Sequence, residues 1–280
     1  MSYLWLTTFI WAFSFSLIGR YVAPNCDSYL TVLVRSGIAF LIFLPFLNFK
    51  IANSLKLKFI TLGALQIGIM SIFYYNSFKY LTVSEVALFT IFTPFWVGLL
   101  YSIFTKTLSL RLFLGIFVCI LGAFIIKFSS LSGEFWLGFA IIQGANLVFA
   151  LGQVGYKLVC ANQPNIAHRS VFGYFFLGAA IIGSVGFTLF GNHAKIPQDG
   201  TTWTILVYLG VVASGLGYFL WNKGACKVSG GMLAVMNNAV IPCAILVEVV
   251  IFGGKIANLT TFLLGSALMF SSLLFYKGQK

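Results

Sequence analysis

Polar side chains that could bind a solute lie inside a stretch that is otherwise apolar enough for a lipid bilayer. Ser229–Glu248 carries two adjacent amides, Asn237 and Asn238, a proline at position 242 and the carboxylate of Glu248. Polar groups are costly in hydrocarbon, and they are kept where they face a cavity or a protein partner. The composition of this stretch therefore predicts a binding surface inside the membrane.

A second stretch has the same layout. Lys79 precedes Pro94 by the same spacing as Lys227 precedes Pro242, and in both cases a Ser/Gly turn and an apolar run lie between them. Both prolines fall about ten residues into their predicted helices, near the bilayer midplane, where transporters with broken helices bind their substrates. A purely structural pair of kinks is the alternative interpretation.

Each proline also removes one backbone hydrogen bond. The carbonyl four residues earlier loses its donor, so the carbonyls of Thr90 and Asn238 are expected to be short of a partner.

Amides recur along one face of another predicted helix. Gln143, Asn146, Ala150 and Gln153 fall on one stripe at helical spacing. Lipid offers amides no hydrogen-bond partner, so the stripe must face protein or water. It either joins helices to one another or lines a path for a solute, and the sequence leaves both readings open.

Aromatic and polar residues of other helices complete the predicted substrate site. Trp11 lies in the middle of its helix, where an aromatic cavity wall explains it better than an interfacial anchor does. The remaining members of the predicted site are Ser14, Tyr74, Tyr75, Asn76, Trp221 and Asn222.

Three ionisable residues lie within or at the start of predicted spans. Glu85 opens a helix, where a carboxylate complements the N-terminus, and Glu248 lies deeper in its span. Both are candidates for coupling transport to a proton, and a structural role is the alternative for each. Arg35 either extends its charge toward the membrane surface or holds a carboxylate, with the structural role slightly favoured.

Nothing in the sequence predicts an enzyme, a cofactor or a metal site. Both aspartates and both histidines lie in or beside predicted loops, and neither H-E-x-x-H nor G-x-S-x-G occurs. The cysteines are scattered without a C-x-x-C pair, and we interpret them as packing residues. They are Cys26, Cys119, Cys160, Cys226 and Cys243.

The elements that must position these residues are transmembrane helices. The chain has 280 residues, is 60% hydrophobic and only 8% charged, whereas a soluble domain carries about 25% charged residues. Segments of about 20 mainly apolar residues predict an all-α integral membrane protein with ten spans. They are 3–21, 29–49, 58–79, 84–105, 110–127, 135–158, 170–191, 202–222, 230–253 and 257–276.

Basic residues between the spans predict the orientation. Eleven of them lie on the side of both termini, against five on the other side, which places both termini in the cytoplasm. The eleven are Lys50, Lys56, Lys58, Lys106, Arg111, Lys157, Arg169, Lys223, Lys227, Lys277 and Lys280; the five are Arg20, Lys79, Lys127, Lys195 and Lys255. The net charge of +12 is thus explained by orientation in an inner membrane, and no nucleic-acid partner is predicted.

The paired proline stretches lie five spans apart. Five is odd, so the second copy enters the membrane from the opposite side. The sequence therefore predicts two inverted five-helix repeats, 1–130 and 131–280, which is an architecture of secondary transporters.

Together these features resemble the EamA-domain part of the drug/metabolite transporter superfamily. The resemblance rests on the Trp11-Ala-Phe-Ser motif, on Arg35 early in span two, on a fourth span with Ser, Ala and Pro repeated in the ninth, and on Trp221-Asn222 before the Asn237-Asn238 pair. It implies a central cavity among spans one, three, four, six, eight and nine, with spans five and ten at the periphery, and transport by alternating access.

The predicted function is secondary active transport of small polar metabolites, with amino acids, amines or carboxylates as the main expectation. An exporter of drugs or other metabolites, or a nucleoside-like solute carrier, is the alternative, and a channel or a membrane scaffold is disfavoured. The predicted partners are a small-molecule substrate and the lipid bilayer, with the protein a monomer or a homodimer. The second stretch has amides where the first has Phe89-Thr90, so the cavity is expected to be asymmetric.

Overall fold

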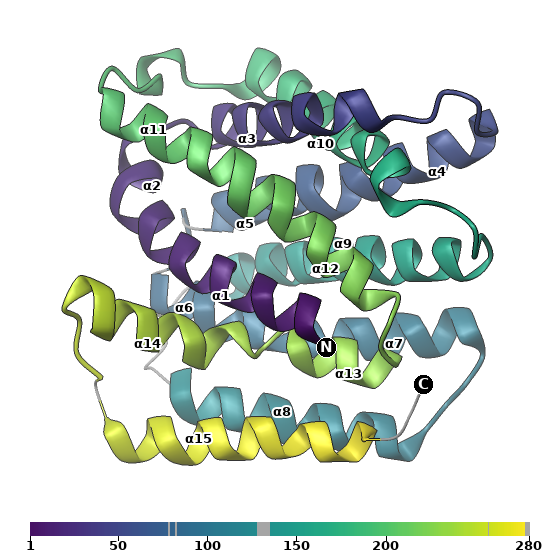
Figure 1. Ribbon diagram of the computed structural model, residues 1–280. Coiled ribbons are helices and arrows are strands. Elements are labelled where there is room, and N and C mark those ends of the chain that lie inside the picture. The colour runs from purple at the N-terminus through teal and green to yellow at the C-terminus, as the bar shows by residue number, and fades with distance from the viewer. Residues whose placement is uncertain (78, 82, 128–134, 257, 278–280) are drawn as a thin grey trace.

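The computed structural model describes residues 1–77, 79–81, 83–127, 135–256 and 258–277, and every regular element in these ranges is a helix (Figure 1). The first half contains α1 (Ser2–Leu17), η1 (Ile18–Val22), α2 (Ala23–Asn25), α3 (Ser28–Phe43), η2 (Leu44–Phe46), α4 (Asn53–Gly63), η3 (Ala64–Ile69), α5 (Met70–Ser77), α6 (Val83–Phe89), η4 (Thr90–Phe92), α7 (Thr93–Thr105) and α8 (Leu110–Lys127). The second half contains α9 (Trp136–Ala161), α10 (His168–Phe190), η5 (His193–Lys195), α11 (Gly200–Tyr208), η6 (Leu209–Leu216), α12 (Gly217–Ala225), α13 (Gly230–Met236), α14 (Val240–Phe252), α15 (Leu259–Ser271) and η7 (Ser272–Tyr276).

The all-helical membrane architecture is confirmed, and the count of ten spans stays a prediction. Among the described residues, nine helical stretches are long and apolar enough to cross a membrane, and a shorter apolar helix covers Leu110–Ile126. The predicted loop between spans five and six, with the boundary between 130 and 131, lies outside the described residues.

The helices run alongside one another, and both chain termini lie at the same end of the bundle (Figure 1). α8 and α15 pack together on one side of it. A Cβ atom placed on Gly122 would lie 2.6 Å from the Gly265 carbonyl oxygen, and one on Gly265 would lie 2.5 Å from the Gly122 oxygen. The two backbones thus meet directly at a pair of glycines, as small residues allow in membrane helices.

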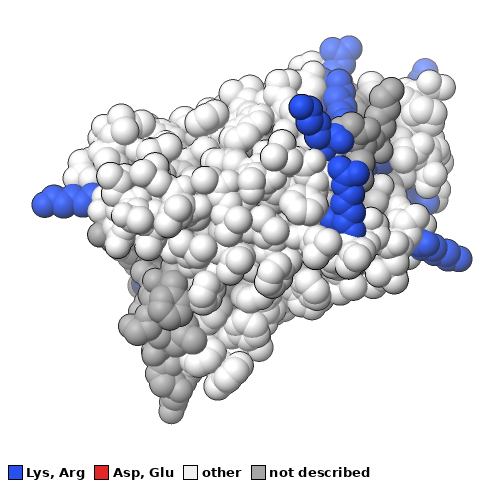
Figure 2. All heavy atoms as spheres, turned by 90° about the horizontal axis from the view of Figure 1, so that it is seen from below, with Lys and Arg blue, Asp and Glu red and all other residues white. Residues whose placement is uncertain are grey.

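Most exposed basic side chains lie toward the ends of the bundle. On the face shown in Figure 2, Lys and Arg gather mainly toward the end that holds the termini, and the middle is free of them. At the opposite end, Asp27 caps α3 by accepting from the N–H groups of Tyr29 and Leu30, at 2.9 and 3.0 Å. Asp199 caps α11, and the Thr202 N–H that it accepts lowers the pKa of its carboxyl below the ordinary value.

Two helices are interrupted beside a proline, and the interruptions match. In the first, a seven-residue helix (α6), the 3₁₀ turn η4 and a thirteen-residue helix (α7) follow one another. In the second, a seven-residue helix (α13), a turn at 237–239 and a thirteen-residue helix (α14) do so. Pro94 and Pro242 lie within the first turn of the resumed helix, where the missing N–H costs no intrahelical bond.

Both interrupted helices also end alike. α7 ends at Lys106 with φ of 54°, and α14 ends at Gly253 with φ of 70°. In the described part of the chain these are the residues with positive φ. A left-handed residue terminates a helix and turns the chain away, so both stretches share an end as well as a break.

Wider π-helical turns interrupt the third and the eighth predicted spans as well. They are η3 and η6. Such turns are rare and often lie at functional sites. η3 and η6 occupy corresponding spans of the two predicted halves. A third π-helical turn, η1, ends the first predicted span, whose counterpart α9 is uninterrupted.

Candidate functional site

The first helix break is bonded to α9 through two amides. The Phe89 carbonyl oxygen accepts from Nδ2 of Asn146 at 2.9 Å and from Nε2 of Gln143 at 3.1 Å. The Thr93 hydroxyl donates to Oδ1 of Asn146 at 3.0 Å, and the indole N–H of Trp96 donates to Oε1 of Gln143 at 2.9 Å. Five polar groups of α9 and the broken helix therefore satisfy one another inside the bundle.

At the second break, amide side chains of the break itself form the hydrogen bonds to neighbouring helices. Nδ2 of Asn238 donates to the Ile91 carbonyl oxygen of the first break at 2.9 Å. Asn237 and Gln153 exchange hydrogen bonds of 3.2 and 3.3 Å, and the Trp221 indole N–H donates to Oε1 of Gln153 at 2.9 Å. The amide stripe of α9 thus contacts both breaks and faces protein.

The expected shortage of donors at two backbone carbonyls is wrong. The Thr90 oxygen accepts the backbone N–H of Thr93, and it shares the Thr93 hydroxyl proton, at 2.8 Å, with Oδ1 of Asn146. The Asn238 oxygen accepts the Ile241 N–H at 3.0 Å because the chain tightens to i+3 bonding at the break. Bonding to i+3 therefore gives both carbonyls a donor, and the Thr93 hydroxyl adds a further contact at the first break.

Aromatic rings from α1, α9 and α12 form a second part of the site. The ring centroid of Trp11 lies 5.0 Å from that of Trp221, 5.2 Å from that of Tyr218 and 6.3 Å from that of Phe149. The Trp11 indole N–H donates to the carbonyl oxygen of Ala213 in η6 at 2.9 Å. The predicted aromatic wall at Trp11 is thus a cluster of four rings anchored to the π-helical turn.

Arg35 lies beside the same turn. Its Nε donates to the Ser214 hydroxyl at 3.1 Å, and its Nη1 lies 3.5 Å from the Tyr75 hydroxyl. The side chain is half-buried. Among the described residues, the ion pair joins Arg20 and Glu248. The positive charge of Arg35 therefore faces the neutral oxygens of Ser214 and Tyr75.

Three predicted site residues bond within their own helices. The side chains of Ser14, Asn76 and Asn222 each donate to the backbone carbonyl four residues earlier, at 2.7, 2.8 and 3.0 Å. Tyr74 packs edge-on to Tyr75 with ring centroids 5.7 Å apart. The polar groups of Ser14, Asn76 and Asn222 are thus bonded locally, within α1, α5 and α12.

One amide was not selected from the sequence as a site residue. Gln66 of η3 is fully buried, and neither its Nε2 nor its Oε1 has a hydrogen-bond partner among the described residues. It packs against Gly152 of α9, where an added Cβ would lie 2.2 Å from Cβ of Gln66. Buried amide groups normally form hydrogen bonds. An amide inside a predicted span is therefore a signal by which this position could be found in the sequence.

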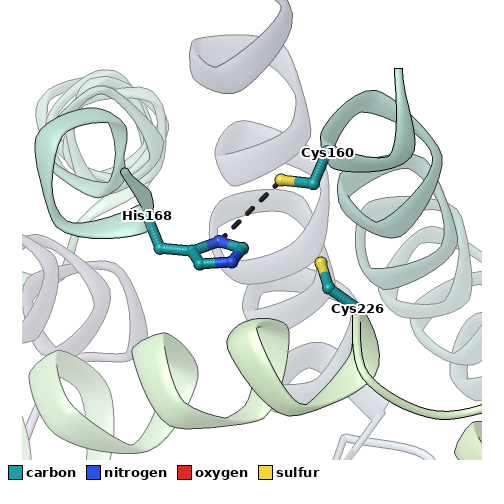
Figure 3. Close-up of side chains that lie close together, drawn as sticks. All are labelled: Cys160, His168 and Cys226. Carbon is teal, nitrogen blue, oxygen red and sulfur yellow. Dashed lines mark hydrogen bonds between the residues drawn. The ribbon is translucent and has the colours of Figure 1, made fainter. Parts of the chain in front are cut away.

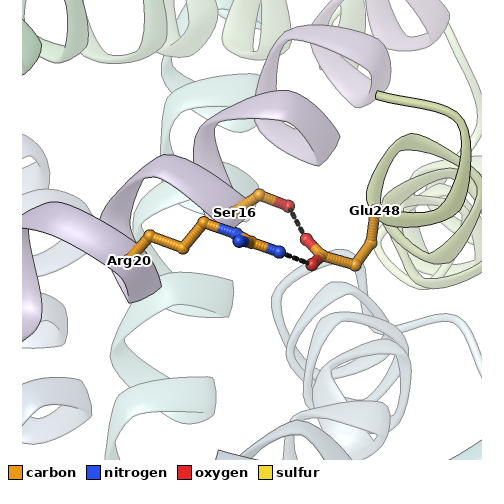
Figure 4. A network of polar contacts seen from close by, with 3 residues as sticks. All are labelled: Ser16, Arg20 and Glu248. Carbon is orange, nitrogen blue, oxygen red and sulfur yellow. Dashed lines mark hydrogen bonds and ion pairs between the residues drawn. The ribbon is translucent and has the colours of Figure 1, made fainter. Parts of the chain in front are cut away.

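The two candidate coupling carboxylates lie apart. Glu248 accepts from the Ser16 hydroxyl at 2.6 Å and forms an ion pair with Arg20, so it joins α14 to the end of α1 (Figure 4). Both charged side chains remain more than one third exposed, at 45% and 37%. Glu85 is buried in the first turn of α6.

A cleft of about 880 Å³ opens beside the start of α4 and the segment that leads into α10. Its lining includes Lys58 and Arg169. It contains none of the residues predicted to bind substrate, which pack in the interior of the bundle.

Comparisons with known proteins agree with this architecture. Residues 1–128 match the model of the EamA-like transporter family. The biotin transporter of Escherichia coli strain K12 is 42% identical over 276 residues, covering 98% of this chain and 91% of that protein. The biotin transporter of Salmonella typhimurium is 40% identical with the same coverage, and the probable biotin transporter of Pseudomonas aeruginosa is 40% identical with 98% and 96% coverage.

The chain belongs to the EamA-like transporter family. A crystal structure of a protein shares the fold, with a TM-score of 0.79 at 15% identity over 99% of this chain and 96% of the other. The predicted family is therefore confirmed, and the protein is a multi-pass membrane transporter of small molecules. The expectation of amino acids or amines as substrates is not confirmed.

Proposed function

We propose that this protein carries biotin, or a closely related apolar monocarboxylate, across a cell membrane by secondary transport. The observation that carries the proposal is the likeness to biotin transporters, at 40–42% identity along 98% of the chain. Amino acids and other small carboxylates share only the carboxylate with biotin. They are the second candidate because the same cation could hold them.

Arg35 is the proposed partner of the substrate carboxylate. A guanidinium inside a helix bundle that faces only neutral groups is costly, and an arriving carboxylate offsets this cost. Arginine also presents a planar fork of donors that matches a carboxylate with two parallel bonds. Ser214 and Tyr75 orient this fork from two other helices.

The remaining parts of biotin have candidate partners close by. Trp11 bonds Ala213 and Arg35 bonds Ser214, so the aromatic cluster and the cation meet at adjacent residues of η6. Aromatic rings suit an apolar ring system and an alkyl chain. The amides of Gln153 and Asn237, beyond Trp221, offer both donors and acceptors to a cyclic urea.

Two inverted halves, 1–130 and 131–280, are proposed to rock about this site. The matched breaks, the matched left-handed ends and the π-helical turns in corresponding spans support the repeat. The protein is proposed to lie in the inner membrane with both termini in the cytoplasm, since most basic residues flank the spans on the side of the termini.

Uptake of radiolabelled biotin into proteoliposomes tests the proposal. The wild-type protein should show saturable uptake and counterflow, and Arg35→Gln should lower uptake by about tenfold or more, the size expected when one partner of a buried charge pair is removed. Arg20→Gln, which changes an exposed arginine, is the matched control and should retain uptake. Full activity of Arg35→Gln would contradict the role of this residue, and uptake of amino acids without biotin would contradict the substrate.

A further inference from the structure

Three metal-ligand side chains come together at the end of the bundle that holds both termini. Cys160 lies at the end of α9, His168 at the start of α10 and Cys226 directly after α12. Their ligand atoms all lie within 4.8 Å of one another, and Sγ of Cys160 is 3.9 Å from Nδ1 of His168. Figure 3 shows the imidazole and the two thiols facing one another from three separate helices.

Hydrogen bonds from α9 hold two of the three ligand positions in place. Nζ of Lys157 donates to the carbonyl oxygens of Ala225 and Val228, at 3.1 and 2.6 Å, and so holds the segment with Cys226 against α9. The fully buried Tyr156 places its hydroxyl 2.9 Å from Nδ1 of His168. The arrangement is thus held by hydrogen bonds that do not involve the thiols.

We propose that Cys160, His168 and Cys226 bind a zinc ion. Thiolate and neutral imidazole are the ligands that zinc prefers, and its bonds of about 2.3 Å to sulfur and 2.0–2.1 Å to nitrogen place tetrahedral donors about 3.5–3.8 Å apart. The three ligand atoms would therefore have to move closer together by about 1 Å or less to bind a zinc ion. Binding releases one proton from each thiol, since the ligands are thiolates.

The surroundings suit such an ion. A hollow of about 220 Å³ adjoins the three ligands and leaves space for a water molecule as the fourth ligand. Lys157 and Lys227 line the same hollow, and nearby cations favour thiolates over thiols. The Tyr156 hydroxyl, 2.9 Å from Nδ1 of His168, can accept a hydrogen bond from Nδ1–H while Nε2 binds the metal. Metal-bound imidazoles usually donate their other N–H to a partner in this way.

A bound ion would join the sixth, seventh and eighth predicted spans. All three ligands belong to residues 131–280, so the ion would cross-link helices within one proposed half and leave the contact between the halves free. The cluster lies apart from Arg35 and the helix breaks, and its existence does not depend on the transported substrate.

Cobalt provides an optical test on the purified, reduced protein. Titration with Co²⁺ should produce a thiolate-to-metal absorption band that saturates at one equivalent per chain and disappears when Zn²⁺ is added. Cys160→Ala and Cys226→Ala should lose the band, and the matched control Cys243→Ala should keep it. Tyr156→Phe should weaken the affinity by about 10- to 100-fold, the range for losing the hydrogen-bond partner of a metal-bound histidine.

Alkylation of the wild-type protein avoids any dependence on variants that fold poorly. Zn²⁺ should slow the reaction of Cys160 and Cys226 with iodoacetamide, read by mass spectrometry, and leave the rate at Cys243 unchanged. The absence of a cobalt band in fully reduced protein, a band that survives Cys160→Ala, or equal alkylation with and without Zn²⁺ would each overturn the site.

Discussion

The two interrupted helices, α6–η4–α7 and α13–α14, have the same backbone plan and opposite bonding roles. Each has seven residues, a short break and thirteen further residues that end in a left-handed turn. At the first break, a backbone carbonyl oxygen accepts hydrogen bonds from two amide side chains of α9. At the second, the side chains of Asn237 and Asn238 reach out to α9 and to the first break. The comparison shows that backbone geometry is shared while the polar side chains differ.

This difference explains why the site is asymmetric. Both breaks converge on one amide stripe, Gln143 to Gln153, but only the second contributes amides of its own. A solute between the halves would thus meet carbonyl oxygens and rings on one side and amide donors on the other. Such a lining suits a molecule with chemically different ends.

The largest expected effect comes from removing both amides that bond the first break. Interhelical hydrogen bonds in membranes contribute about 0.6–2 kcal/mol each. Gln143→Leu or Asn146→Leu alone should cost at the low end of this range because the other amide still reaches the Phe89 oxygen. The double variant should lose more stability than the sum of the single variants, measured as thermal unfolding in detergent. Strict additivity would show that the two amides do not share this acceptor.

Asn238→Ala tests the contact between the two breaks. It removes the donor to the Ile91 oxygen and should lower stability by about 1 kcal/mol. Because the bond joins the two predicted halves, the transport rate should change as well. Asn237→Ala is the comparison variant, since its amide bonds α9 instead. Equal effects of the two variants on transport would argue against a special role of the contact between the halves.

Replacing the prolines tests whether the two helix breaks contribute equally to stability. Pro94→Ala and Pro242→Ala should each destabilise by about 0.4–1 kcal/mol, chiefly because the unfolded chain gains freedom. The two values should agree, since both prolines lie in the first turn of a resumed helix. Unequal losses in the unfolding temperature of detergent-purified protein would show that the breaks are supported differently.

The smallest effect is expected at the carboxylate in the resumed part of the second helix, since the resumed part of the first, α7, has none. Glu248 of α14 pairs with Arg20 at the partly exposed edge of the bundle, and such pairs contribute at most about 1 kcal/mol. Glu248→Gln should therefore leave biotin uptake and its pH dependence unchanged in proteoliposomes. Loss of the pH dependence in this variant would instead assign proton coupling to Glu248.

Local sequence patterns predicted much of the fold. Apolar length predicted the helices, the prolines predicted both breaks, and helical spacing placed Gln143, Asn146 and Gln153 on one face toward protein. These features depend on residues close together in the chain, so periodicity and backbone chemistry are enough to find them.

Pairings between distant residues could not be predicted in the same way. Ser16 and Arg20 meet Glu248 across more than two hundred residues, and Cys160 meets Cys226 only when α9 and α12 lie side by side. Such contacts depend on the rotation and depth of each helix, which hydropathy leaves undetermined. The same reason explains why Ser214 could not be identified from the sequence as the partner of Arg35.

The central claim is that Arg35 recognises a substrate carboxylate between the two halves. Competition binding of biotin and biotin methyl ester to the wild-type protein and to Arg35→Gln tests it most directly. The wild-type protein should bind the acid about tenfold or more tightly than the ester, and the variant should bind both with the same, weaker affinity. An undiminished preference for the acid in Arg35→Gln would contradict this account of the site.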